Sequence, residues 1–254
     1  MITITREDNM ELMARYPDNY FDLAIVDPPY GILNKTKRGG DYKFNMEEYS
    51  QWDVKPNNKY FEELFRVSKN QIIWGGNYFG QLWGRSEYNK GFIIWDKNQP
   101  ETLNNFSMAE MAWSSLDKPS KIFRYSVRKN RNKIHPTQKP VELYDWLIKM
   151  YAKQGDKILD THLGSGTIAI ACYNAGLSLT ACEISETYYF SALEKIREFV
   201  SISAIHTSDL DSFSLTFPGQ TKSKNGLFKQ YKEQIEQLKL FKEKRVQYYS
   251  TVKV

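Results

Sequence analysis

The sequence predicts an α/β protein with a mostly parallel, seven-stranded sheet and helices on both faces. Short apolar segments alternate with longer amphipathic ones along roughly the first 200 residues, which is typical of parallel strands joined by helices. The chain has 254 residues, of which 41% are hydrophobic, so it can bury the core of one large domain. Proline and glycine stand where helices would begin and end, at Pro140 and Gly176.

The expected strands are short apolar runs, in chain order at residues 2–5, 23–26, 71–74, 92–95, 108–114, 157–159 and 178–182. The expected helices lie at residues 60–67, 141–152, 167–175 and 188–200. Apolar side chains recur at helical spacing in the second of these helices, which Pro140 is well placed to start. Irregular segments are expected between residues 31 and 54 and between 116 and 134.

We expect residues 1–205 to form the main domain, with basic segments inserted at about 31–55 and 116–134. Residues 206–254 are expected to form a linker and a helical extension. The linker composition, rich in Ser, Thr and Asp, runs through residues 201–225. Residues 227–246 carry one apolar stripe, which predicts a helix packed on its own domain or, as the alternative, a dimerisation helix.

Basic residues are concentrated in one stretch. Residues 118–133 contain seven Lys or Arg residues and no acidic residue, with Phe123 and Tyr125 among them, in a chain of net charge +5. Basic side chains neutralise phosphates, and aromatic rings stack on unpaired bases. The stretch is therefore a candidate for nucleic-acid contact, although a solvated surface loop has the same composition.

The numbers and spacing of the cysteines and histidines argue against a disulfide-stabilised protein and against a zinc-binding protein. The two cysteines, Cys172 and Cys182, lack metal-ligand spacing and fit a reducing cytosol rather than a disulfide framework. The three histidines are scattered, so no zinc site is predicted. No apolar run approaches the length of a membrane span, and the N-terminus lacks a signal-peptide hydrophobic region. We expect a cytoplasmic protein without a metal or a membrane partner.

The candidate catalytic motif is Asp27-Pro28-Pro29-Tyr30, which follows the apolar run at residues 21–26. Two consecutive prolines cannot continue a central strand, because neither donates a ladder hydrogen bond. The motif therefore presents a carboxylate, free carbonyl groups and a phenol ring at one edge of a sheet. These groups suit a planar ring with an exocyclic amino group, which is to say a nucleobase.

A second motif follows the strand at residues 157–159 and consists of Asp160, Thr161, His162, Leu163, Gly164, Ser165, Gly166 and Thr167. Glycines allow a sharp turn and a close approach to a ligand, which then faces the N-terminus of the next helix. Glu183 comes 19 residues after Gly164, before Ile184, where an acid can accept from both hydroxyls of a ribose. A structural turn alone would explain the glycines, but the strand, helix and distal acid together favour a nucleoside-bearing cofactor. The turn does not choose between a dinucleotide and S-adenosylmethionine.

The third motif, His135-Pro-Thr137-Gln-Lys139-Pro140, precedes the helix expected at residues 141–152. Lys139 and the amides at the start of the helix would suit a carboxylate. A proline-shaped loop with a surface lysine is the alternative.

The three motifs in this order resemble the S-adenosylmethionine-dependent DNA amino-methyltransferases of the permuted, or β, class. In that class the Asp-Pro-Pro-Tyr motif comes first, a recognition region follows, and the glycine motif comes late. Segments 74–79 and 91–97 also look like those of phage-type and prophage-type relatives. The resemblance extends from residue 2 to about residue 200. It implies a Rossmann-like methyltransferase fold and S-adenosylmethionine as cofactor.

The resemblance assigns cofactor binding to Asp8, Asp27, His135, Thr137, Lys139, Asp160, His162, Leu163, Gly164, Ser165, Gly166, Thr167, Glu183 and Ile184. It places the strand at residues 2–5 beside the strand at 178–182, so that Asp8 lies near the cofactor's adenine. Asp8 would equally suit a helix N-cap. His162 departs from the family, which usually has Phe there, and an imidazole can pack under the methionine part as Phe does.

The reaction that the resemblance implies is methylation of an exocyclic amine in double-stranded DNA, after base flipping. Tyr30 would stack on the base, while Asp27 and the Pro28 carbonyl accept hydrogen bonds from the amine. Adenine N6 is expected rather than cytosine N4, because family members with Asp at the first motif position mostly methylate adenine. No Pro-Cys nucleophile is present, in keeping with direct transfer.

DNA contacts are expected from basic residues in the two inserted segments, namely Lys35, Lys37, Arg38, Arg124, Arg128, Lys129 and Arg131. The resemblance also allows a homodimer, a cognate restriction nuclease, and a bacterial or phage-infected host cell. Alternatives are methylation of RNA or of a protein glutamine, and a catalytically silent nucleic-acid-binding paralogue. A nicotinamide dehydrogenase would leave the Asp-Pro-Pro-Tyr motif unexplained.

Overall fold

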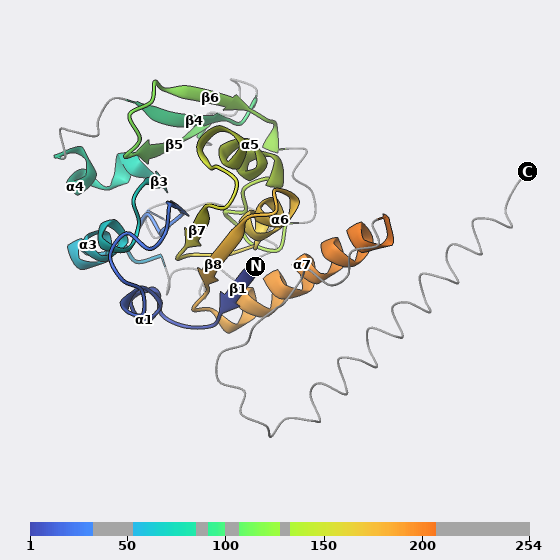
Figure 1. Ribbon diagram of the computed structural model, residues 1–254. Coiled ribbons are helices and arrows are strands. Elements are labelled where there is room, and N and C mark those ends of the chain that lie inside the picture. Colours follow the sequence, from blue (N-terminus) through green and yellow to red (C-terminus); the bar gives the residue numbers. More distant parts are fainter. Residues whose placement is uncertain (33–52, 85–90, 100–106, 128–132, 207–254) are drawn as a thin grey trace, which may run out of the picture. The chain divides into compact units, whose positions relative to one another are not determined.

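The computed structural model describes residues 1–32, 53–84, 91–99, 107–127 and 133–206 (Figure 1). The helix expected at residues 227–246 and the basic loop at 34–40 lie outside these ranges. Within them, no helix is long and apolar enough to cross a lipid bilayer.

The described residues form one eight-stranded sheet in the order β1-β8-β7-β2-β3-β5-β4-β6. All pairings are parallel except the two made by β5, which runs antiparallel to β3 and β4. The predicted mostly parallel α/β fold is therefore confirmed. The strands are β1 (Ile2–Thr5), β2 (Leu23–Val26), β3 (Gln71–Trp74), β4 (Phe92–Asp96), β5 (Ala109–Ser114), β6 (Lys121–Arg124), β7 (Lys157–Asp160) and β8 (Ser178–Cys182).

Helices cover both faces of the sheet. Figure 1 shows α1 and α3 on one side, and α5 and α6 on the other. The strands between them, β2 and β3, are buried along their whole length, which explains why they read as continuous apolar runs without alternation. The helical elements are α1 (Asn9–Ala14), α3 (Asn58–Val67), the 3-10 helix η2 (Gly76–Tyr78), α4 (Gly80–Trp83), α5 (Val141–Tyr151), α6 (Thr167–Asn174) and α7 (Glu186–His206).

The structure corrects the predicted elements in several places, and it adds the short helices α1, η2 and α4, which were not predicted. An eighth strand, β6, lies in the stretch expected to be irregular, where it pairs with β4 at the edge of the sheet. Only Phe123 of its four side chains is partly buried, so the strand lacks the apolar alternation that would reveal it in the sequence. Helix α7 also runs through residues 201–206, which were expected to belong to a linker, because no Gly or Pro interrupts it.

The N-terminal strand β1 pairs in parallel with β8, in the register Ile2↔Leu179 to Thr5↔Cys182, as predicted. The central order β8-β7-β2 then places three more strand ends beside it. Because parallel strands end at the same edge of a sheet, the residues that follow β1, β2, β7 and β8 gather there.

Candidate active site

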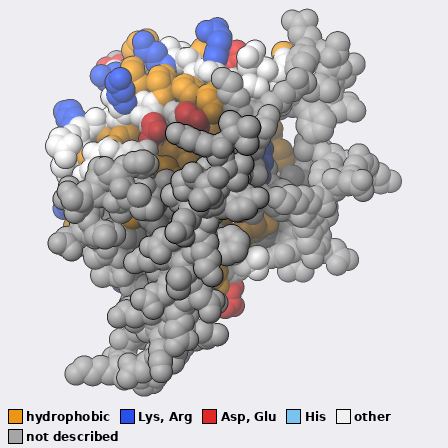
Figure 2. Space-filling view, turned by 90° about the vertical axis from the view of Figure 1, so that its right-hand side faces the viewer, with side chains coloured by type: hydrophobic (Ala, Val, Ile, Leu, Met, Phe, Trp, Pro, Cys, Tyr) orange, Lys and Arg blue, Asp and Glu red, His pale blue; other side chains and the backbone are white. Residues whose placement is uncertain are grey.

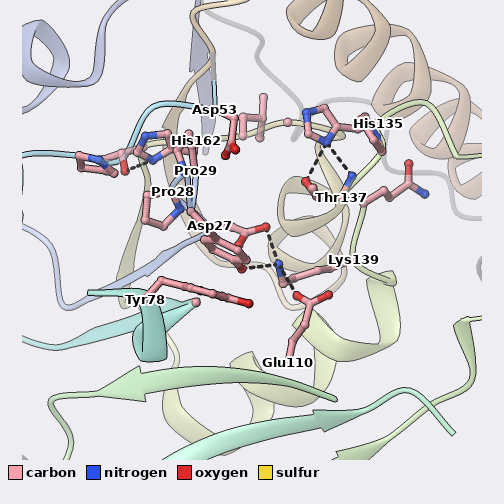
Figure 3. A pocket seen from close by; sticks show the side chains of 18 of the residues that line it. Asp27, Pro28, Pro29, Asp53, Tyr78, Glu110, His135, Thr137, Lys139 and His162 are labelled. Carbon is pink, nitrogen blue, oxygen red and sulfur yellow. Dashed lines mark hydrogen bonds and ion pairs between the residues drawn. The ribbon is translucent and has the colours of Figure 1, made fainter. Parts of the chain in front are cut away.

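A cavity of about 1400 Å³ lies at the carboxyl edge of the parallel strands and brings the three sequence motifs together (Figure 3). Pro28 after β2 and Ser165 after β7 both line it, although 136 residues separate them in the chain. Most of the predicted site residues line the same cavity, namely Asp8, Asp27, Pro28, Pro29, Tyr30, His135, Thr137, Lys139, His162, Leu163, Gly164, Ser165, Thr167, Glu183 and Ile184.

The Asp-Pro-Pro-Tyr motif is held in place by side chains from other elements. The Tyr30 hydroxyl donates to Asp27 Oδ1 at 2.5 Å. The Tyr30 ring stacks on Tyr78, with centroids 5.0 Å apart and planes 18° from parallel. A Cβ atom at Gly75 would stand 2.1 Å from Tyr30 Cε1, so only glycine leaves room for the ring. Gly75 also has φ of +69°, where glycine is favoured.

Lys139 lies between two carboxylates beneath this motif. Its side chain is 1% exposed, its ammonium donates to Asp27 Oδ2, and it stands 3.1 Å from Glu110 Oε2. Glu110 Oε1 lies 2.8 Å from Lys97 Nζ. Figure 3 shows the Asp27, Lys139 and Glu110 side chains pointing toward one another. Lys139 was expected at a cofactor carboxylate, but its charge is directed to Asp27.

Burial and the neighbouring ammonium groups shift the pKa values of the carboxylates in this group in opposite directions. Burial raises the pKa of Asp27 above its usual range, against the attraction of Lys139. Burial likewise places the pKa of Tyr30 well above 10, so its hydroxyl stays protonated and donates. Glu110 differs, because Lys139 and Lys97 outweigh the effect of its burial and lower its pKa to about 2.

The glycine turn precedes helix α6 and lies beside a partly buried acid, Glu183. Gly164 and Gly166 have φ of +53° and +70°, and a Cβ atom at Gly166 would approach Ile196 Cδ1 to 2.9 Å. The Gly164 amide donates to Glu183 Oε2 at 2.8 Å, and the Ser185 amide donates to Oε1 at 2.9 Å. Each oxygen of Glu183 keeps a second lone pair, which a ribose hydroxyl could use.

The first residue of the glycine motif is buried at the end of β7. Asp160 Oδ1 accepts from the His162 amide at 3.0 Å. Burial raises the pKa of Asp160 to about 8, and the charges of Asp27 and Glu183 act in the same direction. Asp160 therefore shapes the turn from beneath, and neither Asp160 nor Gly166 lines the cavity.

Both histidines of the motifs are neutral. His135 Nδ1 accepts from the Thr137 amide at 3.3 Å, and its ring packs edge-on against Tyr188. Burial, together with the charges of Lys139 and Lys195, lowers the pKa of His135 to about 3. A Cβ atom at Gly164 would lie 3.7 Å from the His135 ring, so the third motif packs directly on the glycine turn.

His162 and Asp8 both lie at the start of helix α1. His162 hydrogen-bonds Asn9 Nδ2 at 3.1 Å and packs edge-on against Tyr60. Burial lowers the pKa of His162 to about 3. Asp8 caps helix α1, because its carboxylate accepts from the Met10 amide at 2.7 Å, and it also lines the cavity. The capping role is thus observed, and the adenine contact stays a prediction.

The predicted DNA contacts are only partly within the described chain. Arg124 lies on the edge strand β6, outside the cavity, with Nε 3.2 Å from Asp96 Oδ2. Figure 2 shows Lys and Arg side chains beside hydrophobic ones at the top of one face, at the height that β6 has in Figure 1. The remaining predicted contacts lie outside the described residues, namely Lys35, Lys37, Arg38, Arg128, Lys129 and Arg131.

Several cavity residues were not predicted by the sequence analysis, among them Tyr60, Tyr78, Lys97 and Glu110. The available signal for Glu110 was an acid inside the apolar run of β5. Among the described residues, no group of three or more His, Cys, Asp or Glu side chains is arranged to hold a metal ion.

Comparisons with known proteins agree with this geometry. Residues 74–194 match a family described as DNA methylase. The type II methyltransferase M.HpaI of Haemophilus parainfluenzae is 25% identical over 229 residues, covering 74% of this chain and 71% of the relative. The type II methyltransferase M.BglII of Bacillus subtilis is 24% identical over 237 residues, covering 71% and 65% respectively.

Solved structures show the same fold. The M1.HpyAVI complex with S-adenosylmethionine aligns with a TM-score of 0.54 at 20% identity, covering 77% of this chain and 100% of that chain. The cytosine-N4-specific PvuII DNA methyltransferase aligns with a TM-score of 0.54 at 15% identity, covering 79% and 91%.

The fold is therefore the Rossmann-like methyltransferase fold. The family match and the curated relatives go further. They support an S-adenosylmethionine-dependent DNA methyltransferase, in a family that includes adenine-N6 and cytosine-N4 enzymes.

The residues present fit S-adenosylmethionine. The partly buried carboxylate of Glu183 borders the cavity and is oriented by two backbone amides, an arrangement that suits recognition of ribose hydroxyls. The glycine turn borders the same cavity through Leu163, Gly164 and Ser165. Its neighbours His135 and His162 are neutral, so they can face a cationic sulfonium without repelling it.

Proposed function

We propose that this chain is a site-specific DNA methyltransferase that moves a methyl group from S-adenosylmethionine to the exocyclic N6 of an adenine flipped out of double-stranded DNA. The observation that carries the proposal is the shared cavity. Asp27 and Tyr30 reach it from the end of β2, while the glycine turn and Glu183 reach it from β7 and β8. An acceptor for an amino group thus lies beside a site for a nucleoside.

Cofactor binding is assigned to one side of this cavity. Glu183 would accept from the ribose hydroxyls, Asp8 would face the adenine, and the turn from Leu163 to Gly166 would lie against the methionine part. When bound, the cofactor supplies an activated methyl group on a sulfonium. The supporting contacts would come from His135, Thr137, His162, Thr167 and Ile184, while Asp160 would act indirectly by holding the turn through the His162 amide.

The target base would lie against Tyr30, Asp27 and Pro28. Tyr30 OH and Lys139 each use one lone pair on a different oxygen of Asp27, so each oxygen keeps another for the target amine. The Pro28 carbonyl is a further acceptor, since the motif leaves the ladder at this point. Hydrogen bonds from the amine to these acceptors pull its nitrogen toward a pyramidal geometry and free the lone pair for attack.

The protein's contribution to catalysis is therefore position and electrostatics. As the nitrogen–carbon bond forms, the sulfur–methyl bond would break, the sulfur would leave as a neutral thioether, and the methylated amine would then lose one proton to solvent. Asp27 must be ionised to accept from the amine. Its buried ion pair with Lys139 favours that state, although burial works against it.

Cytosine N4 is the alternative target. The cytosine-N4-specific PvuII enzyme shares the fold, which favours this alternative. Asp rather than Ser at position 27 favours adenine, by resemblance to the family. Both amines have the same hydrogen-bonding groups, so the acceptors of the cavity suit either.

The proposal includes the wider setting that the resemblance implies. The chain would be a permuted, phage-like or prophage-like enzyme of the bacterial cytoplasm, acting as a monomer or homodimer and paired with a cognate restriction nuclease. Residues 1–205 would form the catalytic domain, with the basic segments on the DNA. The β1–β8 pairing supports the permuted order, because it sets the first strand of the chain beside a strand that follows the late glycine motif.

The test is transfer of radiolabelled methyl groups from S-adenosylmethionine to unmethylated DNA, with RNA and protein extract as parallel acceptors. Digested DNA should contain labelled N6-methyl-2′-deoxyadenosine. Label in N4-methylcytosine would establish the alternative, and label only in RNA or protein would overturn the proposal.

A further inference from the structure

Glu110 has no role in the proposed binding of cofactor or base, yet it lies in the cavity at the centre of a charged group. Asp27, Lys139, Glu110 and Lys97 form a chain of alternating charges, here called the buried charge chain. Glu110 comes from the antiparallel strand β5, between Lys139 at 3.1 Å and Lys97 at 2.8 Å. Figure 3 shows it reaching toward Lys139 from the side opposite Asp27.

The chain balances two carboxylates against two ammonium groups. A buried ammonium with one carboxylate partner directs its whole charge at that partner. In this structure Lys139 is 1% exposed and shares its charge between Asp27 and Glu110. Asp27 therefore keeps more electron density on its oxygens than it would in an isolated ion pair.

The third donor position of Lys139 points toward the Tyr30 hydroxyl, whose oxygen is 3.5 Å from Nζ. Lys139 also lies over the Trp74 ring, 5.1 Å from its centroid. These contacts fix the ammonium from several sides, and Glu110 supplies the only carboxylate besides Asp27 that pairs with it among the described residues. The position of Asp27 Oδ2 thus depends on Glu110 through Lys139.

We propose that Glu110 is a positioning residue for methyl transfer, which holds Lys139 between two carboxylates and thereby sets the orientation and acceptor strength of Asp27 toward the target amine. The inference rests on the proposed function, because it assigns Asp27 to the amine. It applies whether the amine belongs to adenine or to cytosine.

The charge of Glu110 should also affect how kcat for methyl transfer depends on pH. The pKa of Asp27 depends on Lys139, Glu110 and Tyr30. The charge of Asp27 in turn acts on Asp160 of β7, Tyr60 of α3 and Tyr144 of α5. Glu110 raises the pKa of Asp27, and Lys139 lowers it. Removing the charge of Glu110 therefore lowers the pKa of Asp27, whereas removing Lys97 leaves Glu110 to act more strongly and raises it.

The experiment measures kcat for DNA methylation across pH for wild type, Glu110→Gln, Glu110→Asp and Lys97→Met. We expect kcat of Glu110→Gln at neutral pH to fall about 10- to 100-fold, as expected for a misplaced catalytic group. The pH below which kcat of Glu110→Gln declines (its acid limb) should nevertheless be lower than for wild type. Glu110→Asp should restore part of the rate, and Lys97→Met should move the acid limb to higher pH.

Binding and folding are measured on the same variants. Calorimetry should give an unchanged dissociation constant for S-adenosylmethionine, and KM for DNA should stay within about 2-fold of wild type. Glu63→Gln is the matched control, because Glu63 pairs with Arg66 on α3 and does not line the cavity. This variant should keep the wild-type rate and pH profile.

The outcomes separate the two proposals. A wild-type protein that methylates no DNA base would overturn the proposed function. If wild type is active, an unchanged kcat or an unmoved acid limb in Glu110→Gln would overturn the role of Glu110. Should Glu110→Gln fail to fold, the Lys97→Met profile decides, since an acid limb that stays in place or moves to lower pH contradicts the inference.

Discussion

Gly75→Ala should nearly abolish methyl transfer without weakening cofactor binding. The added Cβ would stand 2.1 Å from Tyr30 Cε1 and 2.6 Å from Tyr30 Cζ. Carbon atoms in contact prefer a separation of about 3.5–4.0 Å, so the ring must move by more than about 1 Å. That movement would disturb both the stack on Tyr78 and the hydrogen bond to Asp27.

The magnitude has two parts. A non-glycine residue at φ of +69° costs roughly 1–2 kcal/mol of folding free energy. A displacement of about 1 Å in an active site can lower the rate about 100-fold. We therefore expect a modest loss of stability in urea and a loss of about two orders of magnitude in kcat at saturating S-adenosylmethionine.

Gly84→Ala is the matched control. Gly84 follows α4 with φ of −77°, and a Cβ atom there would meet nothing within 4 Å. This variant should keep full activity and be neutral or slightly more stable. A Gly75→Ala enzyme with the wild-type kcat would refute the placement of Tyr30 against this glycine, as would an equal loss of activity in both variants.

Three further changes test other parts of the cavity. Asp27→Ala should abolish methyl transfer but leave S-adenosylmethionine affinity largely intact in calorimetry, and an equal loss of affinity would show that its role is misassigned. Glu183→Gln should weaken that affinity about 10- to 100-fold, since hydrogen bonds to charged groups contribute about 1.5–3 kcal/mol, while kcat at saturating cofactor stays within a few-fold. Asp160→Asn should alter stability with pH. The raised pKa of Asp160, about 8, means that the folded state favours its protonated form. Its stabilising effect is therefore complete below the unfolded pKa of about 4 and is lost as pH rises toward 8. In urea unfolding, the free energy of unfolding of Asp160→Asn should rise relative to that of wild type across that pH interval. A difference between the two that stays constant with pH would contradict a buried, protonated Asp160.

Buried polar groups explain why the site is stable enough to hold this geometry. Lys139, Asp27 and Glu110 satisfy one another, so the cost of burying each charge is offset by its partners. Removing one partner leaves an uncompensated charge in the cavity. Variants at these positions should therefore be compared with wild type in both folding and activity before a catalytic role is assigned.

The sequence by itself determined the central sheet and the motifs. Seven strands could be predicted because β2, β3 and β7 are short, largely apolar runs. The other four, β1, β4, β5 and β8, are also mostly apolar. The Asp27–Tyr30 motif and the glycine turn could be found because proline and glycine restrict or free the backbone locally. Such effects depend only on residues adjacent in the chain.

Only the tertiary structure decided what each side chain faces. Lys139 looked available for a cofactor carboxylate, but β2 and β5 bring Asp27 and Glu110 against it from distant parts of the chain. Strand β6 exists because β4 offers it a hydrogen-bonding edge, and its own exposed side chains give no sign of pairing. The physical reason is the same in both cases: backbone preference is local, whereas charge pairing and strand pairing depend on neighbours that folding supplies.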